Sequence, residues 1–588
     1  MCGLVGAFTP CQKPDLSLLA HRGPDSRGIW EDEDVILGHC RLKILDLSKR
    51  GAQPMVSNNG RFILTYNGEI YNFKEIRATL EEKGHKFLSN SDTEVFLNSY
   101  EEWGNQAFDH MNGMFAFAVW DKSDKKMVLG RDRFGVKPLA YYFDENSFFF
   151  ASEIKAILQM KGSIPEIDQG ALSQFFTYSY ISSPATIYKN MFKVEPGSLI
   201  TVSKAKGKLR LQEKKWYTLK PAHPSPFGSY EESKKELRNL LTEAVRRRLV
   251  SEVPLGAFLS GGIDSSIIVG LMARLSGTPV KTYSIGYKNN SLFDETRYAR
   301  QVADFNDCQH TEIKIDYNDA LSVIPKVLDC LDEPFGDSSA IPTYILSREV
   351  GKSITVALSG DGADEIFGGY RKYSGEYYYS LYSRVPKWAG NAFLKSISFL
   401  PASKNNKFSD LIRKAKKFTR GIAKEPWLRH FRWMEIAESD AVSGLMKGVF
   451  FNPELIVKNR YLQCQKLENI NKILFTDIHT CLPNDMLVKV DSMSMANSLE
   501  VRSPFLDFRV VEEVMKMPGQ FKIEKTCLKK ILKETFHDIL PAHLVNRPKQ
   551  GFEIPVGEWF RNELKELFFD TLVKEDGMVS YEKSVQIY

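Results

Sequence analysis

Residues 253–266 read VPLGAFLSGGIDSS, and residues 267–275 continue as IIVGLMARL. The first seven residues predict a strand, SGGIDSS predicts a loop, and the apolar run after it predicts a helix. Gly261 and Gly262 allow a close approach of the backbone to a ligand, and a helix start offers unpaired N–H groups to an anion. The Gly-Lys-Ser/Thr ending of the P-loop is missing from this stretch. The stretch therefore predicts a phosphate-binding turn, but not that of a P-loop fold, which cleaves the bond between the β- and γ-phosphates.

Further strand and helix patterns surround this turn. YEESKKELRNLLTEAVRRRL (230–249) predicts a charged helix, and KTYSIGY (281–287), HTEIKI (310–315) and SITVAL (353–358) predict strands with helices between them. Such alternation is typical of an α/β parallel sheet. Beyond about residue 375 the pattern is largely helical.

A second strand and loop read VALSGDGADEIFGGY (356–370) and hold three acidic residues, Asp361, Asp364 and Glu365. Two interpretations are open for them. Acidic residues stabilise the beginning of a helix through its dipole, so they can be purely structural. Carboxylate oxygens are also the ligands that Mg²⁺ prefers, so they can hold a metal ion.

The first 160 residues have a different pattern. RFILTYNGEI (61–70), GMFAFAVWD (113–121), KMVLGRD (126–132) and SFFFASE (147–153) predict strands, and FKEIRATLEEKG (73–84) and DTEVFLNSYEEWG (92–104) predict helices. Strand runs with a few helices favour an α+β layered domain. Residues 196–228, with a Lys-rich stretch and PAHPSPFG, are interpreted as a linker. We therefore expect one domain over residues 1–215 and a second over residues 216–588.

Cys2 stands directly after the initiator Met1. Removal of Met1 makes Cys2 the N-terminal residue, and its α-amino group, which titrates near ~7.7–8.0, can then act as the base for its own thiol. By position alone, such a cysteine is more often a chance residue than a nucleophile. Further on, Asn67–Gly68 has two interpretations: a hairpin turn, or a pair of N–H donors for an oxyanion.

The motifs around Cys2 decide between these interpretations. MCGLVGAF, AHRGPDSRG, GHCRLKILD, YNGEIYNF, SDTEV, GMFAFAVWD, RDRFGVKPLAYY and ASEIKAIL occur in this order within residues 1–158. Together they resemble the class II glutamine amidotransferase domain of the asparagine synthetase family. The resemblance implies an N-terminal-nucleophile fold, a four-layer sandwich of two antiparallel sheets between helices. It also implies that Cys2 is the nucleophile, that Asn67 and Gly68 form the oxyanion hole, and that glutamine is bound by Arg41, Leu42, Lys43, Ile44, Leu45, Asn67, Gly68, Glu69 and Asp92.

The second half resembles the ATP-pyrophosphatase-type synthetase domain of the same family. The resemblance implies that ATP is cleaved to AMP and pyrophosphate and that Mg²⁺ is held between Asp264 and Asp364. It implies ATP binding by Leu259, Ser260, Gly261, Gly262, Asp264, Ser265, Ser266, Ile285, Ser359 and Gly360. Asp361 and Lys549 are the further catalytic residues that it implies; Lys549, in NRPKQGFEIP, matches a lysine that stabilises developing negative charge.

The carboxylate that accepts the nitrogen stays open at this point. The resemblance favours asparagine synthetase, in which the acceptor is aspartate. Asp361 stands where some asparagine synthetases have glutamate, and relatives that amidate sugar acids in surface-polysaccharide synthesis are a second possibility. A catalytically retired scaffold or regulator of the same fold is a third. Cys2, SGGIDSS and Asp364 argue against the last, because a retired site need not keep these residue types together.

Composition restricts the function in other ways. The chain of 588 residues has 26% charged residues and a net charge of +6, too weak to argue for nucleic-acid binding. Its eight cysteines show no disulfide or zinc spacing, as is usual for a protein of the cytoplasm. The chain has no apolar run of membrane-spanning length and no signal peptide, so we expect no membrane partner and a cytoplasmic location. The expected partners are glutamine, ATP and the acceptor, and the family resemblance adds a homodimer.

Overall fold

The computed structural model describes residues 2–8, 12–221, 229–288, 294–398, 400, 407–446, 451–545, 547, 559, 562 and 564–572. The N-terminal half contains two six-stranded sheets, and all neighbouring strands in them are antiparallel. In spatial order the first sheet consists of β10 (Met191–Lys193), β8 (Ala140–Phe143), β9 (Phe148–Ala151), β1 (Gly3–Phe8), β3 (Val35–Arg41) and β2 (Ser26–Glu31). The second consists of β12 (Lys208–Lys215), β11 (Ser198–Ala205), β7 (Lys126–Arg131), β6 (Gly113–Asp121), β5 (Phe62–Ile70) and β4 (Met55–Val56).

Helices cover both outer faces of this pair of sheets. Large apolar side chains such as Phe8, Trp120 and Phe150 fill the space between the sheets. On the second sheet lie α1 (Phe73–Glu82) and α2 (Asp92–Trp103), and on the first lies α4 (Ile154–Lys161). The predicted four-layer sandwich is therefore confirmed. Two further helices of this half are α3 (Ala107–His110) and α5 (Gln169–Tyr178).

The linker interpretation of residues 196–228 was wrong for its first part. Ser198–Ala205 and Lys208–Lys215 form the paired strands β11 and β12, and β11 also pairs with β7. The apolar side chains of β11 are buried, while most residues of β12 are exposed because it is the edge strand. The Lys-rich composition belongs to this edge, where charged residues discourage pairing with other chains.

The second half is built on a five-stranded parallel sheet, as predicted. Its order is β15 (Gln309–Ile315), β14 (Lys281–Tyr287), β13 (Leu255–Phe258), β16 (Val356–Leu358) and β17 (Glu500–Arg502). The helices that accompany it are α6 (Tyr230–Arg248), α7 (Ile263–Leu275), α8 (Thr296–Phe305), α9 (Tyr317–Asp329), α10 (Ala340–Val350) and α11 (Ala363–Phe367). A capping box between Ser229 and Glu232 fixes the start of α6.

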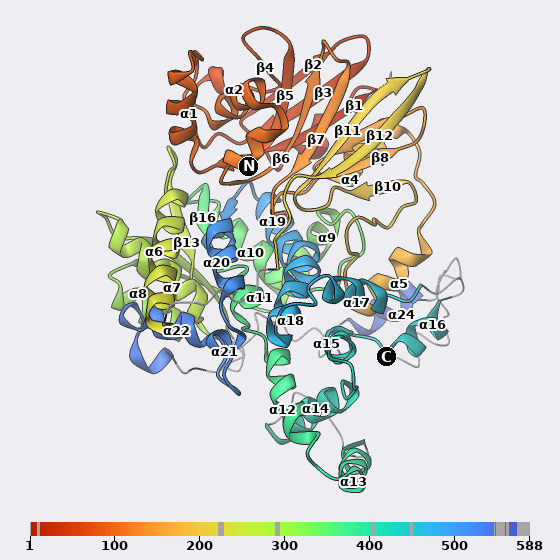
Figure 1. Cartoon of the computed structure of the whole chain (residues 1–588), viewed down its shortest axis with the longest axis vertical. Coiled ribbons are helices and arrows are strands. Elements are labelled where there is room, and N and C mark those ends of the chain that lie inside the picture. Colours follow the sequence, from red (N-terminus) through yellow and green to blue (C-terminus); the bar gives the residue numbers. More distant parts are fainter. Residues whose placement is uncertain are drawn as a thin grey trace.

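The predicted helical tail is also confirmed. It contains α12 (Gly375–Tyr382), α13 (Lys387–Ser398), α14 (Lys407–Arg420), α15 (Pro426–Met434), α16 (Ser439–Leu445), α17 (Glu454–Leu462), α18 (Asn469–His479), α19 (Leu487–Met495), α20 (Phe508–Lys516), α21 (Gly519–Lys522), α22 (Lys530–Thr535) and α24 (Lys565–Leu572). Between α18 and α19 the chain makes a π-helical turn, Leu482–Met486. Figure 1 shows α19 directly beneath the N-terminal sheets, at the border between the two halves.

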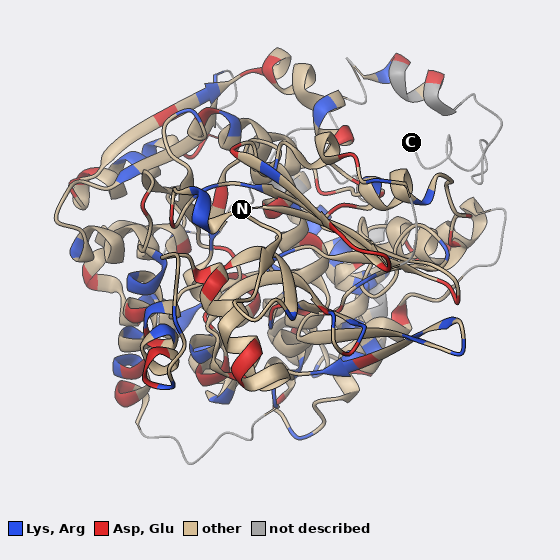
Figure 2. Ribbon diagram, turned by 90° about the horizontal axis from the view of Figure 1, so that it is seen from above, with Lys and Arg blue, Asp and Glu red and all other residues tan. Residues whose placement is uncertain are grey.

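Three global features complete the description. In the view of Figure 2, basic and acidic residues are interspersed along the ribbon, in line with the small net charge. Within the described ranges, no helix is both long and apolar enough to cross a membrane. The seven cysteines in these ranges are all free thiols.

Candidate functional sites

Cys2 lies just before the first strand and is 8% exposed. Its backbone nitrogen donates to the side-chain carbonyl oxygen of Asn67 at 3.0 Å, and its thiol contacts the backbone oxygen of Leu42 at 3.9 Å. Burial raises the pKa of the Cys2 thiol above its usual value. The thiol therefore needs a nearby base before it can act as a nucleophile.

Asn67 and Gly68 lie inside β5, where they pair with Ala116 and Phe115 of β6. The hairpin interpretation is thus wrong. A Cβ atom on residue 68 would lie only 2.6 Å from the backbone oxygen of Met114, so only glycine fits there. The side-chain nitrogen of Asn67 is buried and has no hydrogen-bond partner among the residues that the structure describes. An unpaired buried donor beside Cys2 is suited to receive an oxyanion.

The segment after β3 forms one wall of the Cys2 site. Arg41 donates to three backbone carbonyls, of Leu45 at 3.2 Å, Asp46 at 2.7 Å and Ser48 at 2.9 Å. Its guanidinium therefore holds the chain that follows in a tight bend. Of the predicted glutamine-binding residues in this bend, Leu42, Ile44 and Leu45 are buried and Lys43 is half-buried.

Two carboxylates close the other side of the site. Asp92 begins α2 and accepts hydrogen bonds from the Tyr66 hydroxyl at 2.9 Å and from the Ile70 amide at 3.0 Å. Glu69 lies 3.5 Å from the guanidinium of Arg502, which belongs to the second half of the chain. Burial raises the pKa of both carboxyl groups. A bound ammonium group would favour their charged forms.

The sequence motif HRGPD gave no hint of the role of its arginine. Arg22 is 1% exposed, and its Nε donates to the backbone oxygen of Cys2 at 3.1 Å. Its two terminal nitrogens donate to Glu153 at 3.0 Å and to Asp491 at 2.7 Å. Arg22 thereby connects the Cys2 site to α19 of the second half.

The SGGIDSS loop connects β13 to α7, as predicted, and brings Ser260, Gly261, Gly262, Asp264, Ser265 and Ser266 together with Leu259 at the end of the strand. Gly261 has a φ of +71°, and a Cβ there would lie 2.6 Å from the backbone nitrogen of Ala299. The hydroxyl oxygens of Ser260 and Ser265 are 3.1 Å apart. The hydroxyl of Ser266 is buried and has no partner within the described ranges. The loop thus presents hydroxyls at a helix N-terminus.

The second loop lies against the first because β13 and β16 are adjacent parallel strands. A Cβ on Gly360 would lie 2.8 Å from the Ser265 backbone nitrogen, so glycine permits this contact. The Ser359 hydroxyl donates to Asp361 at 2.6 Å. Ile285 lies in the C-terminal part of the neighbouring β14. These strand ends meet where the chain order of the sheet reverses, the usual place for a ligand in such sheets.

Lys529 is a residue that the sequence interpretation missed. Its ammonium nitrogen lies 2.5 Å from Asp264 and 2.5 Å from Asp364, so carboxylates of the two loops converge on one cation. Within the described ranges, no three His, Cys, Asp or Glu side chains gather as a metal site. Two carboxylates fit a Mg²⁺ ion whose other ligands are phosphate and water oxygens. The predicted Lys549 lies outside the described residues.

The turn before α19 carries a second unexpected group. One carboxylate oxygen of Asp485 is buried and has no partner in the described part of the chain. Burial, and next the charge of Asp337, raise the pKa of Asp485 to about 8, against the opposing effect of Lys489. Lys489, one turn further on, donates to Asp337 at 2.7 Å. Burial disfavours the charged form of Lys489, but the charges of Asp337 and Asp485 raise its pKa.

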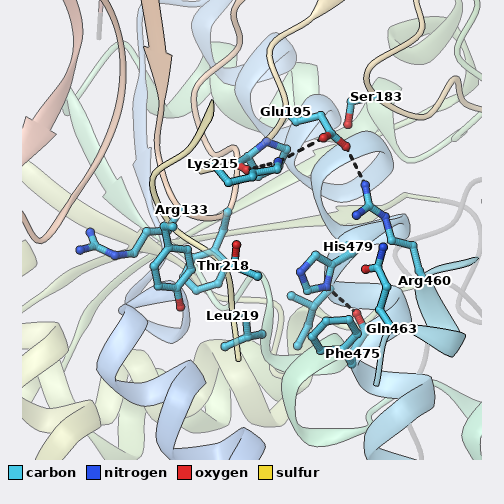
Figure 3. A pocket seen from close by; sticks show the side chains of 14 residues that line it. Arg133, Ser183, Glu195, Lys215, Thr218, Leu219, Arg460, Gln463, Phe475 and His479 are labelled. Atoms are coloured by element: carbon cyan, nitrogen blue, oxygen red, sulfur yellow. Dashed lines mark hydrogen bonds and ion pairs between the residues drawn. The ribbon is translucent and has the colours of Figure 1, made fainter. Parts of the chain in front are cut away.

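A separate pocket of about 70 Å³ lies at the junction of the two halves (Figure 3). Its walls include Glu195 and Lys215 from the first half and Arg460 and His479 from the helical tail. Glu195 pairs with Lys215 at 3.1 Å and with Arg460 at 2.6 Å, and the His479 ring donates to the Phe475 carbonyl at 2.8 Å. None of the predicted site residues lines it. Its cationic groups already have partners, so it serves as part of the junction.

Two protein-family models match the chain. Residues 1–217 match the family model of the glutamine amidotransferase domain, and residues 236–585 match that of asparagine synthase. The chain is 35% identical over 582 residues to asparagine synthetase [glutamine-hydrolyzing] 1 of Bacillus subtilis, covering 96% of this chain and 89% of that protein. It is 32% identical over 550 residues to asparagine synthetase [glutamine-hydrolyzing] 3 of the same organism, with 91% and 82% covered. It is 28% identical over 613 residues to amidase chry2 of Gibberella zeae, with 96% and 89% covered.

Proposed function

Because the chain belongs to the asparagine synthase family and is a glutamine-hydrolysing carbon–nitrogen ligase that uses ATP, we propose that its acceptor is aspartate. Nitrogen released from glutamine is transferred to the β-carboxylate of aspartate. ATP is cleaved to AMP and pyrophosphate, because a free carboxylate is a poor electrophile until it carries a leaving group. Mg²⁺, a homodimeric assembly and a cytoplasmic location belong to the same proposal.

In the first half, Cys2 attacks the carboxamide of glutamine after Met1 has been removed. Its α-amino group takes the thiol proton, which is needed because burial raises the pKa of the thiol. The oxyanion accepts hydrogen bonds from the unpaired Nδ2 of Asn67 and from the backbone N–H of Gly68. Asp92 and Glu69 bind the α-ammonium of glutamine, and the bend that Arg41 holds shapes the remaining wall. Hydrolysis of the thioester regenerates the free thiol.

In the second half, the SGGIDSS loop and the hydroxyl of Ser266 bind the phosphates of ATP. Asp264 and Asp364 are the residues to hold Mg²⁺, which would neutralise phosphate charge when bound. Lys529 already lies between them and stabilises the negative charge that develops as pyrophosphate leaves. The acceptor carboxylate attacks the α-phosphate, and ammonia then displaces AMP from the acyl-adenylate.

One observation carries the choice of aspartate. One carboxylate oxygen of Asp485 is buried and has no partner in the described part of the chain, and burial raises the pKa of this carboxyl group to about 8 although Lys489 acts to lower it. An ammonium group is its natural counter-ion, and ion pairing would restore the charged form. Aspartate carries an α-ammonium group, whereas an ordinary sugar acid does not.

The test supplies the purified enzyme with glutamine, ATP and Mg²⁺ and varies the acceptor. We expect AMP release with aspartate, and none with succinate, which lacks only the ammonium group, or with galacturonate. Asp485→Asn is expected to raise the KM for aspartate about tenfold or more, the cost of a lost charged hydrogen bond, and to leave glutaminase activity unchanged. AMP release with a sugar acid but not with aspartate would overturn the choice of acceptor.

A further inference from the structure

The helices α12, α13 and α14, called the helical lobe below, lie at one end of the protein. In Figure 1 they form its lower end, with α13 farthest from the N-terminal sheets. α13 packs against α14. The rings of Tyr378 and Tyr382 on α12 contact the ring of Phe418 on α14, and Phe418 also stacks on Trp433 of α15. Ile412 of α14 is buried. The lobe therefore has a packed interior, and α15 connects it to the rest of the molecule.

The helical lobe has far more positive charge than the rest of the chain. α14 contains six basic residues and one acidic residue, and α13 contains two basic residues and no acidic one. The net charge of these two helices is therefore +7, which exceeds the +6 of the whole chain. The side chains of Lys395, Lys414, Lys417 and Arg420 are exposed. The small net charge of the chain thus hides a strongly basic surface.

Exposed apolar side chains gather in the same part of the chain. Trp388 of α13 is 77% exposed and Leu411 of α14 is 62% exposed. Tryptophan side chains are largely buried on average, so Trp388 is exposed against the usual tendency. Apolar groups gathered at a surface mark a contact with a partner, whereas single ones do not. Among the described residues, six of the seventeen exposed large apolar side chains lie within positions 378–411: Tyr378, Leu381, Val385, Trp388, Leu400 and Leu411.

Apolar and basic side chains alternate along one side of α14. Leu411, Lys414 and Lys417 are spaced by three residues, which makes them neighbours on the helix surface, and all three are exposed. A lysine has an apolar stem that ends in an ammonium group. Such a side chain can contact a charged group while the leucine beside it enters an apolar layer. The side of α14 that carries these residues is therefore amphipathic.

This combination fits a lipid surface better than a nucleic acid. Basic residues attract anionic headgroups, and tryptophan and leucine side chains enter the boundary between headgroups and acyl chains. A nucleic acid also attracts basic residues, and an aromatic ring can stack on its bases. The aliphatic side chains of Val385, Leu400 and Leu411 have no ring to stack, so a nucleic acid gives no reason for their exposure.

We propose that the helical lobe binds the surface of membranes that contain anionic lipids. The basic side chains of α14 contact the headgroups, and Trp388 and Leu411 enter the layer beneath them. The expectation of no membrane partner rested on the lack of a membrane-spanning segment, and binding at the surface needs none. The inference is independent of the acceptor and of the role of Cys2.

Co-sedimentation of the full chain with vesicles tests the proposal. We expect binding to vesicles of equal parts phosphatidylcholine and phosphatidylglycerol, and little binding to phosphatidylcholine alone. Raising the salt from about 0.1 M to about 1 M shortens the Debye length from about 10 Å to about 3 Å and should release much of the protein. The triple variant Lys414→Gln/Lys416→Gln/Lys417→Gln should bind at least about tenfold more weakly, because each basic residue near an anionic surface is worth about fivefold in affinity.

Lys204→Gln/Lys206→Gln/Lys214→Gln is the matched control. These three lysines are also exposed, and they lie on the hairpin of β11 and β12. The control variant loses the same number of charges, so it should bind vesicles almost as well as the wild-type chain. Both triple variants should keep glutaminase activity and AMP release, because none of the substituted residues lies in either site.

Tryptophan fluorescence gives a second measurement, which does not depend on a loss of charge. Brominated phosphatidylglycerol quenches a tryptophan that enters the bilayer. The chain has eight tryptophans, so Trp388→Phe is measured beside the wild-type chain. We expect quenching in the wild-type chain and its loss in Trp388→Phe, whose larger ring-to-lipid contact is otherwise kept by phenylalanine.

Four results would overturn the proposal. One is equal binding to vesicles with and without phosphatidylglycerol. Another is an equal loss of binding in the two triple variants. A third is equal quenching in the wild-type chain and in Trp388→Phe. The fourth is binding to single-stranded polyuridylic acid without binding to anionic vesicles, which would assign the basic surface to a nucleic acid.

Discussion

The side-chain carbonyl of Asn67 accepts a hydrogen bond from the backbone nitrogen of Cys2 at 3.0 Å. The other end of the same amide, Nδ2, is buried with no partner in the part of the chain that the structure describes. One side chain therefore fixes the position of Cys2 and also keeps an unpaired N–H donor near it. A buried unpaired donor is unfavourable for stability, and this disadvantage disappears when an oxyanion forms.

Asn67→Asp separates these two functions. The carboxylate keeps an acceptor for the Cys2 nitrogen but loses the donor and adds a negative charge. We expect the glutaminase kcat to fall about 10²–10³-fold, as for other lost oxyanion-hole donors. Steady-state glutamate release measures this, and ammonia-dependent AMP release is the internal control. A variant with wild-type kcat would exclude Asn67 from the oxyanion hole.

Glutamine binding should weaken toward acid pH. Burial raises the pKa of Asp92 above that of an ordinary carboxyl group, so Asp92 takes up a proton at a higher pH than usual as the pH falls. Protonation removes the negative charge that binds the α-ammonium group, so the Kd for glutamine rises as the pH decreases. Calorimetric titration of Cys2→Ala with glutamine measures this without catalysis.

Asp92→Asn in the Cys2→Ala background is the control for that titration. The missing charged interaction, worth about 1.5–3 kcal/mol, should weaken binding about tenfold to a hundredfold and flatten the pH dependence. An unchanged pH profile in this double variant would assign the effect to another group.

Lys529→Met should abolish amide formation and leave glutaminase activity intact. The ammonium group between Asp264 and Asp364 is lost, and with it the charge stabilisation in the synthetase site. We expect a loss of about 10²-fold or more in AMP release. Lys530→Met is the matched control, because Lys530 is adjacent in sequence but pairs with the exposed Glu524 at 2.9 Å. Equal effects of both substitutions would contradict a specific role for Lys529.

Lys549→Ala remains a prediction from the sequence. It too should lose amide formation and keep glutaminase activity. A parallel loss of both activities with an intact fold would contradict this division of labour.

Asp485 should make the unliganded protein less stable as the pH rises. Its folded-state pKa of about 8 lies above that of an unfolded aspartate, near ~3.9. Between these values the folded chain holds one more proton than the unfolded chain, so stability falls with increasing pH and changes no further above the folded pKa. The Tm difference between Asp485→Asn and the wild-type protein should therefore grow from pH 5 to pH 8 and then level off. Asp440→Asn, at an exposed aspartate, should give a flat difference.

Much of this architecture is predictable because the local and the long-range signals agree. The apolar strand before SGGIDSS, the glycines within it and the apolar helix after it all indicate one turn. In the structure α7 begins at Ile263. The helices over 73–82 and 92–103 follow from their apolar spacing in the same way. The motifs around Cys2 are sufficient to indicate the family.

Other features depend on tertiary context and were missed. β12 is an edge strand with few buried residues, so its composition resembled that of a linker. Asn67–Gly68 has the composition of a turn, but pairing with Ala116 and Phe115 keeps it in a strand. Lys529 contacts Asp264 although the two residues are 265 positions apart in the sequence, and no local sequence pattern predicts such a contact.

The most direct test of the central claim, that Cys2 is the nucleophile that releases the transferred nitrogen, is the paired assay of Cys2→Ala. The variant is supplied with ATP, Mg²⁺ and aspartate, and with either glutamine or ammonium chloride, and amide and glutamate are quantified. We predict no glutamate and no amide with glutamine, and amide formation at the wild-type rate with ammonia. Glutamate release at the full rate from Cys2→Ala would contradict the account.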